Sequence, residues 1–150
     1  MKNISLLLLL FSTFGFAQQA NPEYDEALAK SLNGTDNGMK AYVFCILKTG
    51  SNTTATEVEK AKLFEGHMTN IKKLADEGKL VVAGPFMKND RNYRGIFIFN
   101  VSTVEEAQAL VESDPAVKAK IFEVELTPWY SSAALQETNK IHKKIVKKKL

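Results

Sequence analysis

The chain contains a single cysteine, Cys45, and only two histidines among its 150 residues. One cysteine cannot form an internal disulfide, so the fold must be held together by packing alone. Cys45 lies in an apolar run, where a thiol behaves more often as a small hydrophobe than as a nucleophile. The two histidines, His67 and His142, have no paired ligand spacing, so the sequence predicts no metal site. No residue pattern requires a cofactor.

Long hydrophobic runs are scarce, and the longest lies at the N-terminus. Leu6–Phe11 is an apolar core after a positively charged start, and Gly15-Phe16-Ala17 supplies small residues where a signal peptidase reads. The whole apolar stretch, Ile4–Phe16, is too short to span a bilayer comfortably. We therefore expect residues 1–17 to be a secretory signal, cleaved before Gln18, and the mature protein to be periplasmic or secreted. A membrane anchor is the alternative.

Charge of one sign is concentrated at the other end of the chain. Six lysines lie in the last eleven residues, whereas residues 18–136 carry 13 basic and 16 acidic side chains. This mildly acidic body argues against a nucleic-acid-binding surface on the domain. If helical, the tail would have an apolar edge of Ile141, Ile145 and Leu150 and a cationic face suited to an anionic membrane surface. A frayed, solvated extension is the alternative, because short helices are marginal in water.

Four short apolar segments, rich in β-branched and aromatic residues, predict strands. They are Ala41–Leu47, Lys79–Phe86, Tyr93–Val101 and Ile121–Leu126. We expect Gly84-Pro85 to stop the second of them.

Two amphipathic segments predict helices between these strands. The first, Glu57–Glu77, is expected to start at the N-cap Thr56 and to end at Gly78. Its apolar stripe steps by three and four residues through Ala61, Phe64, Met68, Ile71 and Ala75. The second follows Ser102 or Thr103, and Ser102 and Glu105 have the spacing of a capping box.

The order strand, helix, strand, strand, helix, strand is that of a ferredoxin-like α+β sandwich. Right-handed crossovers place both helices on one face of a four-stranded antiparallel sheet. We expect this domain at residues 40–130, between a polar leader at 18–39, in which nothing demands packing, and a basic C-terminal tail at 131–150.

The first three strands are apolar at consecutive positions, so both faces of the sheet are apolar while the helices cover only one. An exposed apolar face of this size would be well above a few hundred Å². A second copy packed sheet against sheet would cover it, which predicts a homodimeric α+β barrel with interior space. A C-terminal segment folding back is the alternative.

Three ionisable residues could carry chemistry. His67 lies about 60° from the centre of the helix stripe, at the border of the apolar face. There it is either a general base with a carboxylate partner or a surface histidine. Asp90 lies in a polar turn, and Asp114 precedes Pro115 as an N-cap would. Each aspartate is explained structurally when taken alone.

Together, these positions form an ordered set of motifs between Lys40 and Tyr130. The motifs are Glu65-Gly66-His67, Gly78-Lys79-Leu80, Ala83-Gly84-Pro85-Phe86, Asp90 before Gly95, Val104-Glu105-Glu106-Ala107, Ser113-Asp114-Pro115 and Pro128-Trp129. In this order they resemble the YciI-like (YCII-related) domain family, whose members have a dimeric α+β barrel fold.

This resemblance implies a cleft with a catalytic histidine and aspartate. Carried over, His67 is the acid or base and either Asp90 or Asp114 orients it; we favour Asp90 slightly. A relative is a dehydrochlorinase of chlorinated hydroquinones and muconolactone isomerase is similar in fold, so the implied chemistry is elimination or isomerisation. The export signal, leader and basic tail depart from the family pattern, so a cytosolic catabolic role transfers poorly.

We therefore expect a homodimer that binds a small cyclic or aromatic molecule and moves a proton through His67 without a cofactor. Its pocket would be lined by Tyr42, Phe44, Phe97 and Phe99, with the Gly84-Pro85 backbone close to the ligand; as an alternative, these aromatic residues are simply core. The alternative function is a non-catalytic ligand-binding or accessory domain of the cell envelope.

Overall fold

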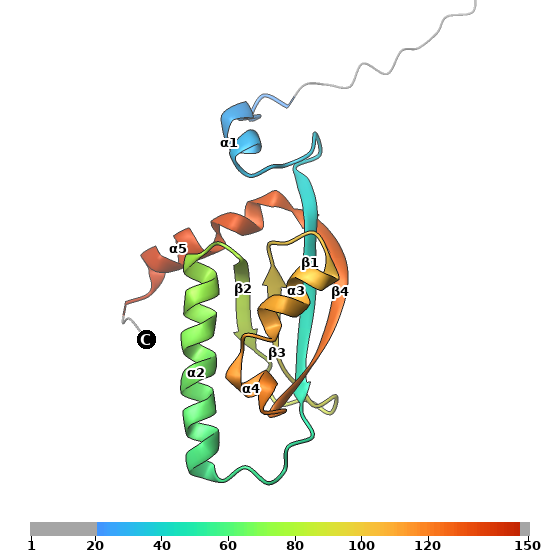
Figure 1. Cartoon of the computed structure of the whole chain (residues 1–150). Helices are drawn as coiled ribbons and strands as arrows, with labels where there is room; N and C mark the ends of the chain where they lie inside the picture. The colour runs from blue at the N-terminus through green and yellow to red at the C-terminus, as the bar shows by residue number, and fades with distance from the viewer. Residues whose placement is uncertain (1–20, 148–150) are drawn as a thin grey trace, which may run out of the picture.

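The computed structural model describes residues 21–147 of the chain (Figure 1). The expected export signal lies outside these residues. The elements are α1 (Glu26–Ser31), β1 (Met39–Thr49), α2 (Glu57–Asp76), β2 (Leu80–Pro85), β3 (Tyr93–Phe99), α3 (Val104–Val111), α4 (Pro115–Lys118), β4 (Phe122–Ser132), the 3₁₀ helix η1 (Ala133–Glu137) and α5 (Thr138–Ile145). Within the described residues, no helix is long and apolar enough to cross a membrane.

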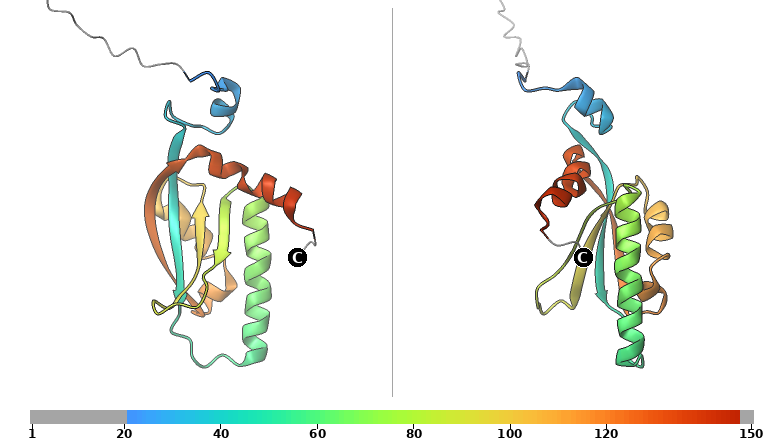
Figure 2. Two further views of the ribbon diagram at one scale, coloured as in Figure 1. Left: turned by 180° about the vertical axis from the view of Figure 1, so that it is seen from behind. Right: turned by 90° about the vertical axis from the view of Figure 1, so that its left-hand side faces the viewer.

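The four strands form one sheet in the order β2-β3-β1-β4, and every neighbouring pair is antiparallel. α2 connects β1 to β2, and the segment containing α3 and α4 connects β3 to β4. Seen along the sheet, these three helices lie on the same side (Figure 2). The predicted ferredoxin-like α+β fold is confirmed.

Strands β1 and β4 are longer than the sequence predicted because they pair along their whole length. Their register runs from Met39 opposite Ser132 to Thr49 opposite Phe122. β4 is an edge strand, so Pro128 can lie within it without breaking a ladder on both sides. For the same reason β2, the other edge strand, includes Gly84 and Pro85 instead of stopping before them.

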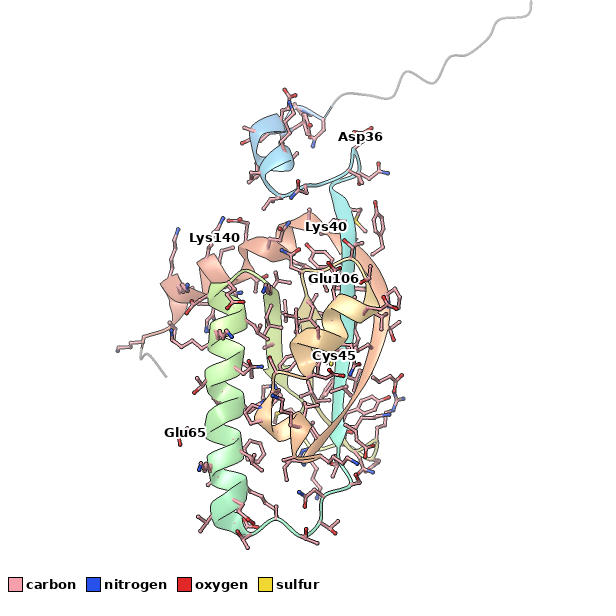
Figure 3. The ribbon with its side chains drawn as sticks, viewed as in Figure 1. Asp36, Lys40, Cys45, Glu65, Glu106 and Lys140 are labelled. Atoms are coloured by element: carbon pink, nitrogen blue, oxygen red, sulfur yellow. The ribbon has the colours of Figure 1, made fainter. Side chains whose placement is uncertain are left out.

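Both long connections begin with a capping box. Thr56 and Glu59 form the box that starts α2, as the sequence predicted for the cap residue. At α3 the pair is Thr103 and Glu106, one residue later than the predicted spacing. Figure 3 shows Glu106 at the start of α3. In each box the Glu side chain accepts a backbone N–H that the first turn leaves without a partner.

The face of the sheet toward the helices holds the main core. Alternate residues of β1 point to this face, so Val43, Cys45 and Leu47 pack beneath the helices with Phe97 and Phe99 of β3. The helices cover this core with four buried side chains: Leu74 of α2, Ala107 and Val111 of α3, and Ala116 of α4.

The opposite face is partly covered by the chain itself. η1 and α5 lie on this side of the sheet (Figure 2), and Leu135 packs against Tyr42, Val81 and Ile98. The Tyr42 hydroxyl donates to the carbonyl oxygens of Ser132 and Ala133 at 3.1 and 3.3 Å. Residues after 130 therefore continue the sheet and fold back onto it, which is the alternative to a second copy that the sequence analysis raised for part of this face.

The segment before β1 is also attached to the domain, although its composition gave no reason to expect packing. Leu32 is buried. Its carbonyl oxygen accepts a hydrogen bond from Nε2 of Gln136 at 2.6 Å. The leader and the C-terminal segment therefore pack together.

Candidate active site

The inward face of α2 differs from the predicted one. His67 and Leu74 are its buried residues, whereas Phe64 and Met68 are partly exposed. The sequence placed His67 at the border of the stripe and Phe64 and Met68 at its centre, so that prediction was off by roughly one residue position around the helix. Close approach to α4 explains the rotation, because a Cβ on Gly66 would lie only 2.9 Å from Cγ of Pro115.

His67 is paired with an aspartate inside the domain. Its Nδ1 lies 2.6 Å from Oδ2 of Asp114. The Asp114 side chain is almost completely buried, with a relative exposure of 1%, and that of His67 is 11% exposed. A pair this short and this well shielded from water has a fixed geometry.

The second oxygen of Asp114 has a structural task. Oδ1 accepts the backbone N–H of Ala116 at 2.8 Å, so Asp114 is the N-cap of α4 and Pro115 is its first residue. The predicted cap is therefore present, and the same carboxylate also holds His67. The sequence suggested Asp114 both as an N-cap and as a partner of His67. Asp114 has both roles, because each of its two carboxylate oxygens makes one of the contacts.

Asp114 fixes the tautomer of His67. A carboxylate can only accept, so Nδ1 of the neutral ring donates and Nε2 keeps its lone pair. Nε2 has no hydrogen-bond partner among the described residues. In that same part of the chain, no buried side-chain nitrogen or oxygen lacks a partner. It follows that solvent reaches Nε2, which is the geometry of a general base.

Aromatic rings surround the imidazole. Phe97 stacks on it with centroids 5.9 Å apart, Phe122 lies at 5.1 Å, and Phe64 meets it edge-on at 6.3 Å. The sequence predicted Phe97 as a pocket residue but not Phe64 or Phe122 in this role. The alternation that starts at Phe122 gave a signal, since it puts Phe122 on the helix side of β4.

Asp90 is not the partner of His67, contrary to the preference drawn from the resemblance. It is exposed in the turn between β2 and β3, which Asn89 organises through hydrogen bonds to Met87 and Tyr93. Asp114 lies next to His67 because α4 packs on α2. The turn that contains Asp90 extends beyond the ends of β2 and β3, away from His67.

The predicted ligand-binding residues are divided between the two faces of the sheet. Tyr42 and Phe44 are on the face opposite His67, because they alternate with Val43 and Cys45 along β1. Gly84 pairs with Ile96 on that opposite face as well. Within one chain these residues do not share a pocket with the dyad, so the prediction of a pocket common to His67, Tyr42, Phe44 and Gly84 was wrong for one chain.

Two of the surface hollows on the described residues are not lined by His67 or Asp114. One, of about 330 Å³, lies at the β2–β3 turn and includes Pro85, Phe86 and Tyr93. The other, of about 470 Å³, lies beside the loop before α2 and includes Asn52 and Leu63.

Cys45 lies deep in the helix-side core (Figure 3). Burial raises the pKa of its thiol to about 12, and the negative charge of Asp114 adds to the shift. A thiol held in its neutral form is a poor nucleophile. Among the residues that the structure describes, no group of three or more His, Cys, Asp or Glu side chains could hold a metal ion.

The fold and the paired histidine define a small α+β domain of a recognised kind. A sequence model of the YCII-related domain matches residues 42–130, more than half of the chain. The protein belongs to the YCII-related domain family.

Individual relatives match over shorter stretches. The chain is 39% identical to Protein YciI of Escherichia coli O6:H1 and to Protein YciI of Shigella flexneri, over 38% of its own length and 65% of theirs. A solved structure, the 5-chloro-2-hydroxyhydroquinone dehydrochlorinase TftG of Burkholderia phenoliruptrix in complex with 2,5-dihydroxybenzoquinone, is 21% identical. The superposition covers 58% of the present chain and 92% of the TftG chain, with a TM-score of 0.42.

Proposed function

We propose that the protein is a cofactor-independent enzyme that moves a proton on a small cyclic or aromatic molecule. His67 is the catalytic acid and base, and Asp114 is its positioning residue. The observation that carries this proposal is the 2.6 Å contact between Nδ1 and Oδ2, made by a buried carboxylate while Nε2 has no partner and is not completely buried among the described residues. This arrangement presents the lone pair of Nε2 in one fixed direction.

The reaction class follows from what these groups can do. Nε2 takes a proton from an acidic C–H bond, and Asp114 stabilises the imidazolium that forms. In an elimination, the electron pair of the broken C–H bond forms a double bond to the adjacent carbon, which loses its leaving anion, and the imidazolium then releases the proton to water. In an isomerisation, the electron pair is delocalised to another carbon, and that carbon takes the proton back from the imidazolium. Phe64, which is 38% exposed and meets the imidazole edge-on, offers an apolar surface to a ring-shaped substrate, while the buried rings of Phe97 and Phe122 pack against the imidazole and hold it in place.

Carbon-acid exchange tests this proposal without knowledge of the natural substrate. The protein is incubated in D₂O with hydroxyquinones, lactones and cyclic ketones, and loss of C–H signals is followed by NMR. We expect exchange with at least one compound, and His67→Gln should abolish it. The matched control is His142→Gln, which removes an exposed histidine on α5. Equal exchange by His67→Gln and the parent protein would exclude His67 as the base.

A ligand-binding domain without catalysis is the second candidate. It is favoured by the hollow at the β2–β3 turn, which includes Pro85 and Phe86 and is not lined by the dyad. Binding of a test compound without any exchange, unchanged by His67→Gln, would support this candidate instead.

The proposed enzyme acts as an exported homodimer. A second copy would cover the rest of the sheet face, where Phe44, Ile46, Val82 and Ile96 are only half-buried. Light scattering of the purified protein should give twice the mass of one chain. A single-chain mass would overturn the dimer and leave the dyad untouched.

Export is supported by the apolar core at Leu6–Phe11 and the small residues before Gln18. N-terminal sequencing of the protein produced in a bacterial host should begin at Gln18, in material from outside the cytoplasm. An intact Met1 in cytoplasmic material would contradict it.

A further inference from the structure

The outer side of α5 carries two exposed isoleucines. Ile141 and Ile145 are 57% and 72% exposed and lie four residues apart, so they are neighbours on one side of the helix. Asn139 is on the side toward the sheet, where it donates to the carbonyl oxygen of Leu80 at 2.7 Å. At 100° per residue, the two isoleucines lie about 200° and 240° from Asn139. They therefore point away from the domain.

The orientation of α5 is fixed by contacts at both of its ends. Before the helix, Leu135 of η1 packs into the second face of the sheet. Within the helix, Nζ of Lys143 donates to Oδ1 of Asp76 at 3.1 Å. Figure 2 shows α5 on the opposite side of the sheet from α2 and α3. The apolar pair is thus held outward by the fold and is not left exposed by a loose terminus.

Positive charge accompanies this pair. Lys140, labelled on α5 in Figure 3, and Lys144 lie beside the isoleucines on one side of the helix, and Lys147 follows the helix. Lys140 pairs with Glu137, whereas neither Lys144 nor Lys147 has a carboxylate partner among the described residues. No acidic residue follows Glu137 in the sequence, although residues 18–136 are net acidic. This end of the protein is therefore complementary to a negatively charged surface.

We propose that α5 docks the protein on the surface of an anionic phospholipid bilayer. Ile141 and Ile145 insert at the boundary between headgroups and acyl chains, and the lysines contact the lipid phosphates. Exposed apolar side chains rimmed by lysine fit this interface, because one surface offers both hydrocarbon and negative charge. A second copy of the chain is a poorer occupant, since it would bring lysines against lysines. A nucleic acid would leave the isoleucines in water.

Vesicle sedimentation tests the proposal. The full chain is mixed with vesicles of phosphatidylcholine alone, or of phosphatidylcholine with an anionic share of phosphatidylglycerol. We expect binding only to the anionic vesicles, and release in 0.5 M salt (about a 4 Å screening length). The double change Lys144→Gln and Lys147→Gln should weaken binding by roughly 25-fold, at about fivefold for each lysine.

The isoleucines are tested separately from the charge. Ile141→Ser with Ile145→Ser should weaken binding at least tenfold while keeping every lysine. Val58→Ser is the matched control, because Val58 is 81% exposed on α2 and should not change binding. The apolar stretch Ile4–Phe16 can bind vesicles by itself. The quantity that tests the proposal is therefore the difference in vesicle binding between the variants and the parent, all measured in the same full chain.

Three results would overturn the proposal. Equal vesicle binding by the serine double variant and the parent would show that the isoleucines do not insert. A parent dimer that the serine change converts to monomers, without vesicles, would show that this face joins two copies. Binding to a DNA duplex as strong as to anionic vesicles, and equally insensitive to the serine change, would show a general polyanion site.

Discussion

The two faces of the sheet are built from alternate residues of the same strands, but they are covered in different ways. Cys45 and Phe99 point to the helix side and are completely buried by helices of the same chain. Tyr42 on the other side is just as buried, by η1, yet Phe44 and Ile46 beside it are only half-buried. Apolar content thus predicts that a face needs a cover, but not which segment supplies it.

The faces also differ in their polar groups. The helix side contains a buried ionisable pair, His67 and Asp114, whose open nitrogen can do chemistry. On the other side, polar side chains donate to backbone carbonyl oxygens: the Tyr42 hydroxyl to those of Ser132 and Ala133, and the half-buried Asn139 to that of Leu80. We therefore expect substitutions on the helix side to change activity and core stability, and substitutions on the other side to change assembly.

The largest expected effect comes from Asp114→Asn. Asparagine keeps the acceptor for the Ala116 N–H but presents an amide donor to Nδ1, which moves the ring proton to Nε2. Loss of the correctly placed base should lower the C–H exchange rate in D₂O by about 10²–10⁴-fold. Asp90→Asn is the matched control and should leave the rate unchanged. If both variants lose activity equally, the geometric pair is not the reacting one.

The next largest effect compares two core residues of β3. Phe99→Ala on the helix side should lower the free energy of unfolding by about 3–5 kcal/mol, because its side chain is fully buried. Ile96→Ala on the half-open side should lose about 1 kcal/mol in a separate protomer, since solvent reaches this side chain there, and more in the proposed dimer. Urea denaturation measures both variants. A loss at Ile96 that stays near ~1 kcal/mol at high protein concentration would contradict the proposed cover by a second copy.

A smaller effect compares two glycines. Gly66→Ala should destabilise the fold by about 1–3 kcal/mol, because the new Cβ would approach Pro115 and push α4 away from α2. Gly84→Ala places its Cβ in open space on the other face and should be close to neutral. Thermal unfolding gives the comparison. If Gly84→Ala instead dissociates a dimer, the second copy packs directly on β2.

The smallest effect at neutral pH concerns Cys45. Its raised pKa favours the folded state only while the thiol stays protonated, so this contribution is complete below the ordinary value near 9.0 and is lost as pH rises toward 12. Melting temperature should therefore fall more steeply above pH 9 in the parent than in Cys45→Ala. Identical slopes would mean that the thiol is not buried in solution. At pH 8, native protein should resist alkylation that denatured protein undergoes.

Local sequence was enough to predict most elements and their caps. The step of three and four residues along Glu57–Glu77 predicted α2, and Thr56 was correctly predicted as its N-cap. Alternation after Ile121 gave the start of β4, and Asp114 before Pro115 gave the cap of α4. These features depend on neighbours within a few residues, so a short window of sequence contains their cause.

The details of the candidate site were less accessible. The sequence proposed both aspartates, but the choice depends on how closely α4 approaches α2, which is decided at Gly66 and Pro115. The error about Phe64 and Met68 has the same origin: several residues around α2 are apolar, and only docking selects the side that faces inward. Tyr42 and Phe44 were assigned to the pocket by residue type, although strand alternation turns them away from His67.

Hydrophobic periodicity and turn residues by themselves determined the order of strands and helices, and with it the ferredoxin-like sheet. The motif order also determined membership of the YCII-related domain family. Tertiary structure alone decided that Asp114 pairs with His67 and that the C-terminal segment folds onto the second face. The physical reason is range: caps and alternation act between residues close in sequence, whereas these contacts join segments 47 or more residues apart, as in His67–Asp114 and Asn139–Leu80.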